Sequence, residues 1–482
     1  TLSIAFTQMA ESSDVLRPDE QEQVAQALED DAEVLSNTQL EEQLAGRPEA
    51  VQDEIIRINT DARPLALQVA LLVPAPGGPA RVPQLLPHDA PPRPEAGGRR
   101  RGGRLRLAAG ARPAPGRRMA AGPSTVRTVG PVLVMNAGST SVKLAVVGDD
   151  GEAAAIDDPG EAPAGLAAVG HRIVHGGERY REPLVLDDAA VEALEGLSAL
   201  APLHNGPALR IVREARRRFP GVPHVAVFDT AFHATIPEEA STYAVPSSWR
   251  ELGIRRYGFH GLSVEWATER AASLLGGPPA LLVVCHIGGG ASATAVRDGR
   301  SADTTMGFSP LEGLVMATRA GSLDPDIPLH LILRRRLPAE DVERAVSEES
   351  GLLALAGTGD MRAVEAAAEG GEADAARALA VHDHRLAAAV GALAASLGGL
   401  DALVFTGGAG EGSARLRAEA ARRLAFLGVA IDPGRNREAE PDAEISAAGS
   451  RVRTLVVRAR EEIVIARAVR RTLVNSPSEG AP

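Results

Sequence analysis

Short apolar runs alternate with glycine-rich turns and helical stretches from about residue 126 to residue 473. Val132 to Met135 and Val142 to Val147 each predict a strand, and the small and polar residues 136–141 between them predict the tip of a hairpin. The run that begins at Leu281 repeats this pattern, with Gly288 to Ser292 as its tip. Two such units in an alternating chain predict a duplicated α/β domain.

A third unit, residues 401–420, predicts a strand, a glycine-rich turn and a helix. A helix that starts after such a turn can place its N-terminus at a phosphate or hold a nucleoside. Hairpin tips of small residues offer backbone N–H groups and hydroxyls to an anion. The three units together therefore predict a phosphotransferase that acts on a nucleotide.

One residue beside the first tip strengthens the phosphate interpretation. The chain has 51 Lys and Arg residues, and Lys143 is its single lysine. A lysine is a compact point charge that an arginine does not replace at a phosphate. A solvated surface lysine is the alternative interpretation.

The chain before residue 126 has a different composition. Residues 1–73 are acidic and rich in glutamine, and they predict a helical extension of unrelated origin. Residues 74–125 are rich in Pro, Gly and Arg without a helical or strand period, which predicts a disordered linker. Its arginines at 99–118 could bind nucleic acid, but a solvated linker is the favoured interpretation. Residues 476–482 are predicted to be a disordered tail.

Charge and cysteine content narrow the class of protein further. The formal net charge of -12 argues against a general nucleic-acid binder. The single cysteine, Cys285, excludes a disulfide framework and suits a reducing cytoplasm. No apolar run reaches the roughly 18 to 20 residues that a bilayer span requires. We therefore expect a cytoplasmic protein without nucleic-acid or membrane partners.

Short polar segments, here called islands, interrupt the apolar stretches of the sequence and contain the candidate catalytic residues. Phosphoryl transfer needs cations over the transferring oxygens, a divalent metal held by carboxylates, and in-line geometry. The islands stand beside glycines at the ends of predicted strands and contain His171, Arg172, His175, His204, Asn205, Asp229, Phe259, His260, Arg319, Asp360, Arg362, Glu461 and Glu462. Any one of them alone is more often a structural residue.

The order of these motifs resembles the acetate kinase family, within the superfamily of acetate and sugar kinases, heat-shock chaperone ATPases and actin. The matches run from about 131 to 470 and include NAGSTSVK, GHRIVHGG, AVFDTAFH, RRYGFHG, CHIGGGAS, TRAGSLDP, GDMR and FTGGAGEG. The resemblance implies an α/β fold of two actin-like (ribonuclease H-like) domains around a cleft. Domain I would span 126–233 and be completed by a C-terminal helix at 463–475, and domain II would span 234–462.

The resemblance also implies an activity, which is reversible phosphoryl transfer from ATP to acetate to give acetyl phosphate and ADP. Mg²⁺ or Mn²⁺ would assist, and the protein would be a homodimer. Two alternatives remain open at this point. One is a propionate kinase, which differs by a methylene in the substrate, and the other is a non-kinase ATPase or regulatory module on the same fold.

The family roles carry over residue by residue. Substrate binding and catalysis would fall to Asp229, Arg172, Arg319, His260 and His204. The nucleotide and its phosphates would contact Lys143, Ser139, Ser141, His286, Gly288, Gly289, Gly290, Asp360, Met361, Arg362, Gly408, Ala409, Gly410 and Gly412. A metal would lie near Asn136 and Glu461. The acetate methyl pocket would be formed by Val174, Leu203, Phe259 and Pro310, next to Arg172.

The sequence departs from the family pattern at several points. Gly289 and Gly412 replace the usual asparagines, and Ser322 stands where an aspartate is common. The stretch between Lys143 and His171 is much shorter than in many members of the family. Residues 1–73 weakly resemble the C-terminal segment of drug exporters of the major facilitator superfamily. A frameshifted exporter tail joined to a downstream gene would look like this, with Met119 as a plausible start.

Overall fold

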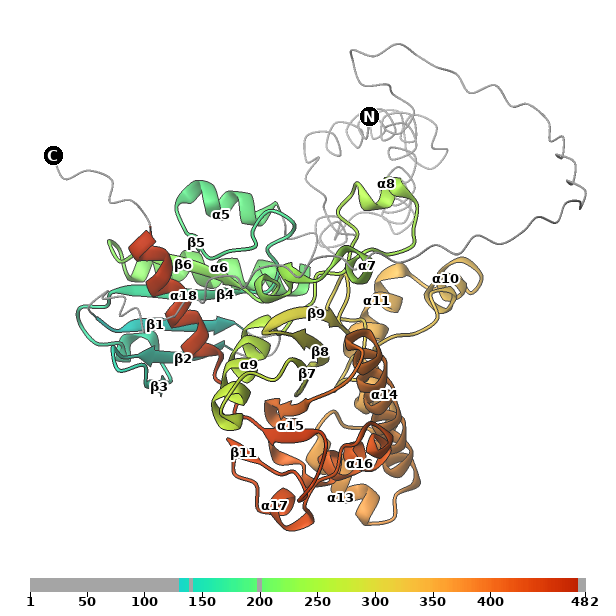
Figure 1. Cartoon of the computed structure of the whole chain (residues 1–482). Helices are drawn as coiled ribbons and strands as arrows, with labels where there is room; N and C mark the ends of the chain where they lie inside the picture. The colour runs from blue at the N-terminus through green and yellow to red at the C-terminus, as the bar shows by residue number, and fades with distance from the viewer. Residues whose placement is uncertain (1–129, 138–141, 197–201, 476–482) are drawn as a thin grey trace, which may run out of the picture. The chain divides into compact units, whose positions relative to one another are not determined.

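The computed structural model describes residues 130–137, 142–196 and 202–475, with the side chains of 202–204 excepted. The extension predicted at 1–73, the linker predicted at 74–125 and the tail predicted at 476–482 lie outside the described residues. Elements carry the labels of Figure 1.

The described chain forms two six-stranded sheets with the same topology. In each sheet an antiparallel three-stranded meander is extended by two parallel strands and then by a short antiparallel edge strand. The first sheet has the order β3-β2-β1-β4-β6-β5, formed by Ala153–Ile156, Val142–Val147, Val132–Ala137, Ala168–Ile173, His224–Phe228 and Leu184–Val185. The second has the order β11-β12-β10-β7-β8-β9, formed by Ala443–Glu444, Arg453–Val456, Ala402–Thr406, Leu281–Ile287, Ala291–Arg297 and Arg300–Thr304. The predicted duplication is confirmed by this shared order.

Helices connect the strands and cover both sheets. The longer ones are α5 (Asp188–Glu195), α6 (Pro202–Arg218), α9 (Gly261–Leu275), α10 (Asp326–Leu333), α11 (Ala339–Glu348), α13 (Met361–Glu369), α14 (Ala373–Leu397), α16 (Ala414–Arg423) and α18 (Glu461–Asn475). Shorter ones are α7 (Glu238–Ser241), α8 (Ser247–Arg250), α12 (Gly351–Ala356), α15 (Gly407–Gly412), α17 (Pro433–Arg437) and the 3-10 turns Pro159–Glu161, Ala231–Thr235 and Ala425–Leu427.

The central strand β1 of the first sheet is buried at every position, and its first four residues are apolar. In β1, Val132 and Val134 pack against α18, while Leu133 and Met135 pack on the opposite side with Ala215 of α6. Strand side chains alternate between faces, so a continuous apolar run needs cover on both sides. The C-terminal helix therefore completes the first lobe, as Figure 1 shows by the place of α18 along β1 and β4.

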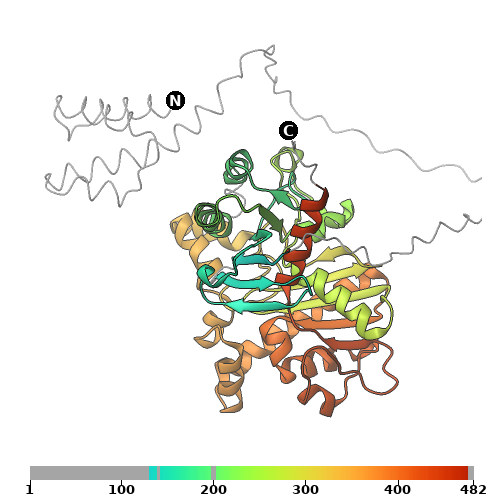
Figure 2. The same cartoon turned by 90° about the vertical axis from the view of Figure 1, so that its left-hand side faces the viewer.

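The second sheet is covered in the same way. Helices α12, α13, α14 and α16 contribute to the apolar cluster on one face, and α9 covers the other face through Val264, Ala267 and Ala271. Helices α9 and α18 also contact each other, and both views place them together between the two sheets (Figures 1 and 2). The predicted fold of two actin-like α/β domains is confirmed. The glycine-rich segment after β10, predicted as a turn, is instead the six-residue helix α15.

None of the helices in the described part of the chain combines the length and apolar character needed to cross a membrane.

Three of the buried histidines have a pKa far below the ordinary value. Burial, followed by the charges of His224 and Arg216, lowers the pKa of His171 to about 3. Burial likewise lowers the pKa of His175 and of His233 to about 4. Their neutral rings are held by structural hydrogen bonds, such as His171 Nε2 to His224 Nδ1 at 2.9 Å.

These histidines predict a loss of stability in mild acid. Each binds a proton in the unfolded chain near pH 6.5 but resists it when folded, so the free energy of unfolding falls as pH drops below 6.5. The slope should reach about 1.4 kcal/mol per pH unit for each histidine. Urea denaturation between pH 7.5 and pH 5.0 measures it. An unfolding free energy that stays constant over this range would contradict the prediction, and substitution of the exposed His384 should leave the slope unchanged.

Candidate active site

A buried ion pair joins the ends of two neighbouring strands of the first sheet. Arg172 lies at the end of β4, and Asp229 directly follows β6, which runs parallel to β4. The Arg172 guanidinium donates from Nε to Asp229 Oδ1 at 2.9 Å, and its Nη2 donates to Asp229 Oδ2. Parallel strands end at the same edge of a sheet, and this brings together two residues that are 57 positions apart.

The same pair is coupled to β1 and α18. Arg172 Nη1 donates to Ala137 O at 3.0 Å and to Asn136 Oδ1 at 3.3 Å, and Asn136 Nδ2 donates to Glu461 Oε2 at 2.8 Å. Burial alone lowers the pKa of Arg172, but the charges of Asp229 and Glu461 outweigh it and raise that pKa. Burial raises the pKa of Asp229, and the charge of Arg172 opposes that rise. The Glu461 pKa is lowered, because Arg172, His286 and Lys143 outweigh its burial.

Two histidines of the second lobe lie side by side next to this network. Their ring centroids are 4.3 Å apart, and serine hydroxyls fix both rings: His260 Nδ1 is 3.0 Å from Ser292 Oγ, and His286 Nδ1 is 2.8 Å from Ser263 Oγ. Burial holds the pKa of both imidazoles below the ordinary value, although the charge of Glu461 opposes this shift at His286. His260 precedes α9 with a left-handed backbone (φ 59°), an uncommon conformation for a residue with a side chain. Both rings are therefore neutral and oriented at neutral pH.

A cleft of about 630 Å³ gathers these groups. Lys143, exposed on β2, and Arg319, which donates to Pro310 O at 3.4 Å, add two cations. Arg172 and Arg319 line the same cavity, and burial first and then the charge of Arg172 lower the pKa of Arg319. Three cations in one cavity favour an anion with several oxygens.

One part of the cleft is apolar. Val174 and Phe259 are almost completely buried, and with Pro310 they line the same cavity as Arg172 and His260. This surface gives a small alkyl group a place beside the cations.

A second cavity of about 310 Å³ adjoins the cleft, and Gly288, Gly289, Ala317 and Gly408 line both. Its mouth carries Asp360, the N-cap of α13, and Arg362, joined by an ion pair of 2.8 Å. Its other lining residues are mainly apolar, namely Ile287, Val315, Met316, Leu352, Met361 and Ala409. A flat apolar ring with a polar attachment fits such a cavity.

The structure brings most of the sequence-predicted residues together. The cleft is lined by Asn136, Lys143, Arg172, Val174, Asp229, Phe259, His260, His286, Gly288, Gly289, Gly290, Pro310, Arg319, Gly408 and Glu461, and the adjoining cavity by Asp360, Met361, Arg362 and Ala409. Gly410 and Gly412 line neither cavity. Ser139 and Ser141 lie outside the described residues, as do the side chains of Leu203 and His204.

Sequence reasoning missed three residues that shape the cleft. Ser263 and Ser292 orient the two histidines, and Glu411 lines the cavity while its Oε1 accepts from Gly407 N at 3.1 Å and from Ala459 N at 2.9 Å. Glu411 and Ser292 lie in motifs that were recognised, but only the tertiary structure shows their partners.

A family model described as the Acetokinase family matches residues 155–467. The chain belongs to this family. Among curated relatives, acetate kinase from Clavibacter michiganensis subsp. michiganensis is 50% identical over 307 residues, which is 62% of this chain and 77% of the relative. Acetate kinase from Leifsonia xyli subsp. xyli is 48% identical over 328 residues, which is 67% of this chain and 81% of the relative.

Solved structures of the family show the same fold. A propionate kinase from Francisella tularensis superposes with a TM-score of 0.66 at 33% identity, covering 70% of this chain and 99% of that one. Acetate kinase from Porphyromonas gingivalis gives a TM-score of 0.64 at 32% identity, covering 72% and 100%. The chain is therefore a phosphotransferase of the acetokinase family, a family whose kinases use ATP and a divalent metal.

The donor set of this acetokinase-family cleft fits a divalent metal held only in part by the protein. The described residues contain no group of three or more His, Cys, Asp or Glu side chains arranged to hold a metal ion. Glu461 lines the cleft with Glu462, and Asn136 is already engaged by Arg172 and Glu461. One or two carboxylates near nucleotide phosphates suit a divalent metal that keeps several waters and phosphate oxygens as ligands.

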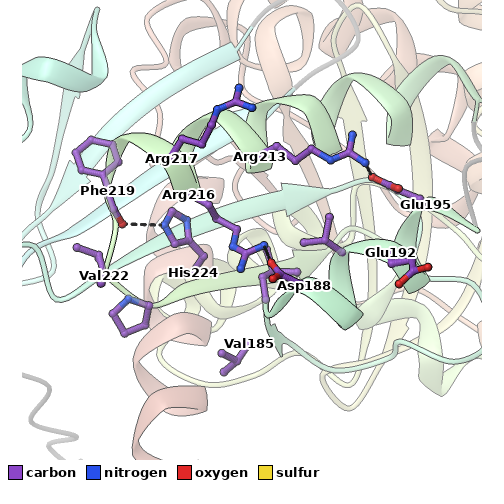
Figure 3. A pocket seen from close by; sticks show the side chains of 14 residues that line it. Val185, Asp188, Glu192, Glu195, Arg213, Arg216, Arg217, Phe219, Val222 and His224 are labelled. Carbon is purple, nitrogen blue, oxygen red and sulfur yellow. Dashed lines mark hydrogen bonds and ion pairs between the residues drawn. The ribbon is translucent and has the colours of Figure 1, made fainter.

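A further cavity of about 590 Å³ lies apart from this cleft, between α5, α6 and the edge of the first sheet (Figure 3). Its polar groups largely satisfy one another. Arg216 pairs with Asp188, Arg213 pairs with Glu195, and His224 contacts His171 and the carbonyl of Phe219. Two of its three lining arginines are thus paired with carboxylates of the same cavity, unlike the cations of the cleft.

A side chain at Gly290 would press on two functional groups of the cleft at once. A Cβ atom there would lie 3.1 Å from His260 Nε2 and 3.4 Å from Arg319 Nη1. Gly290→Ala should displace both groups and lower kcat/KM about tenfold or more, because small misplacements of catalytic groups strongly reduce rate. Steady-state kinetics test this, with Gly277→Ala as control, since a Cβ at Gly277 meets no atom within 4 Å. Equal activity of the two variants would contradict the arrangement.

Proposed function

We propose that this chain is an ATP-dependent acetate kinase that transfers the terminal phosphoryl group of ATP reversibly to acetate. The observation that carries the proposal is the juxtaposition of Lys143, Arg172 and Arg319 with a small apolar surface and an adjoining apolar cavity. The three cations suit phosphoryl and carboxylate oxygens, the apolar surface suits a methyl group, and the adjoining cavity suits a nucleoside. The similarity to curated acetate kinases supports the same assignment.

The reaction suits a site of cations and neutral histidines. An acetate oxygen attacks the terminal phosphorus in line, a new O–P bond forms, and the bond between that phosphorus and the ADP oxygen breaks. The acceptor is a carboxylate, so no proton has to be removed from it and no general base is needed. Arg172 and Arg319 would offset the charge on the transferring group, and neutral His260 and His286 would donate hydrogen bonds to it.

Arg172 has limited hydrogen-bonding capacity left for acetate. All three of its nitrogens already donate to Asp229, Asn136 or Ala137. We therefore propose that Arg172 contributes mainly its charge to the acetate carboxylate and that Arg319 shares in holding it. Glu461 would hold Mg²⁺, and this ion, when bound, neutralises charge on the nucleotide phosphates.

Phosphorylation of propionate is the second candidate activity. The structural relative from Francisella tularensis is described as a propionate kinase. An apolar pocket distinguishes substrates that differ by one methylene by only about 1 to 3 kcal/mol, so both substrates belong in the test. Trapping the acyl phosphate with hydroxylamine, with ATP and either acid, measures the activity directly. A chain that hydrolyses ATP without forming acyl hydroxamate would be a non-kinase ATPase.

Val174 should set the size of the acyl pocket, since its buried side chain lines the cleft beside Phe259 and Pro310. Val174→Ala removes two methyl groups and should raise the ratio of kcat/KM for propionate to that for acetate about tenfold. Val185→Ala, at the partly exposed edge strand β5, should leave the ratio unchanged. If both variants keep the ratio of the natural chain, the acyl group binds elsewhere.

We also propose a homodimer, with α10 in the interface. No residue of helix α10 is buried, and its apolar side chains Ile327, Leu329 and Leu333 are each about half exposed. Exposed apolar patches of this kind mark interaction sites. Arg334 to Arg336 follow the helix and acidic residues open α11, which supports pairing with a second copy of the same surface.

The buried thiol of Cys285 supports a reducing compartment such as the cytoplasm.

Leu333→Asp tests this interface. A charge in the apolar patch should weaken dimerisation about tenfold or more, measured by sedimentation velocity over a range of protein concentrations. Leu252→Asp is the matched control, because Leu252 is 72% exposed in a different part of the described chain. A monomeric natural chain, or equal dimerisation of both variants, would contradict the proposal.

A further inference from the structure

The cavity that adjoins the cleft contains one buried polar side chain whose role is unassigned. His382 projects from α14 into a lining of mainly apolar residues, and it is only 3% exposed. The charged lining residues, Asp360 and Arg362, are exposed and pair with each other. A buried histidine in apolar surroundings normally has a hydrogen-bonding partner.

The protein does not provide that partner. His382 Nδ1 has no hydrogen bond within the described residues and lies 3.6 Å from Asp383 Oδ1, which is too long for one. Across the part of the chain that the structure describes, His382 Nε2 makes no hydrogen bond to another protein atom. Asn205 shows the contrast, because its buried amide is satisfied at both ends by the backbone of His175.

The surroundings of His382 favour one tautomer. Arg415 holds the Asp383 carboxylate with two hydrogen bonds, Nη1 to Oδ2 at 2.7 Å and Nη2 to Oδ1 at 3.1 Å. Burial would raise the pKa of Asp383, but His382 and Arg415 lower it overall, so this carboxylate is ionised. A negative charge next to Nδ1 favours a proton on that nitrogen and leaves a lone pair on Nε2. His382 therefore offers the cavity a hydrogen-bond acceptor.

We propose that His382 determines base specificity, by accepting a hydrogen bond through Nε2 from the 6-amino group of a bound adenine. This inference rests on the proposed function, which places the nucleoside in this cavity. A base with an oxo group at position 6 has no donor there and would set its oxygen against the Nε2 lone pair. The site thereby selects adenine nucleotides over inosine and guanine nucleotides, because a buried acceptor left without a donor weakens binding.

Binding of ADP and inosine diphosphate, measured by isothermal titration calorimetry on the full chain, tests the proposal independently of turnover. The natural chain should bind ADP about tenfold more tightly or better. His382→Phe keeps a ring but removes the acceptor, and it should bring the two affinities to within about twofold, mainly by weakening ADP. His382→Gln restores a carbonyl acceptor and should recover part of the preference. His384→Phe, on the exposed side of the same helix, should behave like the natural chain.

The outcomes separate this inference from the proposed function. A natural chain that binds both nucleotides equally, or a His382→Phe variant that keeps the full preference, would overturn the role of His382 while leaving acetate kinase activity intact. A natural chain that forms no acetyl hydroxamate with ATP would overturn the proposed function instead. Circular dichroism of each variant establishes that it is folded, and His382→Leu, which also lacks an acceptor, replaces His382→Phe if the latter is not folded.

Discussion

The buried ion pair between Arg172 and Asp229 is the interaction on which the cleft depends. Asp229 is 1% exposed and Arg172 is 12% exposed, and removing one partner of such a pair leaves a buried charge at a cost of about 3–5 kcal/mol. The pair fixes the ends of β4 and β6, and through Asn136 and Glu461 it reaches β1 and the first turn of α18. One network therefore determines how the first sheet and the C-terminal helix present their charges to the cleft.

The cleft concentrates positive charge that a bound anion would stabilise. Lys143, Arg172 and Arg319 line one cavity, and burial first and then the charge of Arg172 lower the pKa of Arg319. His260 and His286 add polar groups without adding charge, because burial keeps both rings neutral. An arrangement of this kind is oriented before the substrate arrives, so little reorganisation is needed when charge develops during phosphoryl transfer.

The shared topology of the two sheets explains where these groups come from. Each sheet contributes its first hairpin to the cavity, through Lys143 at the start of β2 and Gly288 to Gly290 at the tip between β7 and β8. Helices α9 and α18 lie between the sheets, and each begins with a residue that matters to the site, since His260 precedes α9 and Glu461 opens α18. The fold thus places residues from distant parts of the chain on one cavity.

Local pattern predicted the two hairpins, the strand within 401–420 and the candidates Arg172, Asp229 and His260, because alternation, turn residues and strand ends depend on near neighbours in the chain. The motif order added the family, and with it the C-terminal helix and the candidate His286. Only the tertiary structure decided that Arg172 pairs with Asp229, that α15 is a helix whose Gly410 and Gly412 line neither cavity, and that His382 turns from α14 into the adjoining cavity. On the sequence, His382 is one polar residue in an amphipathic helix. The direction it faces is set by how α14 packs against strands and helices far away in the chain, and no local period records that packing.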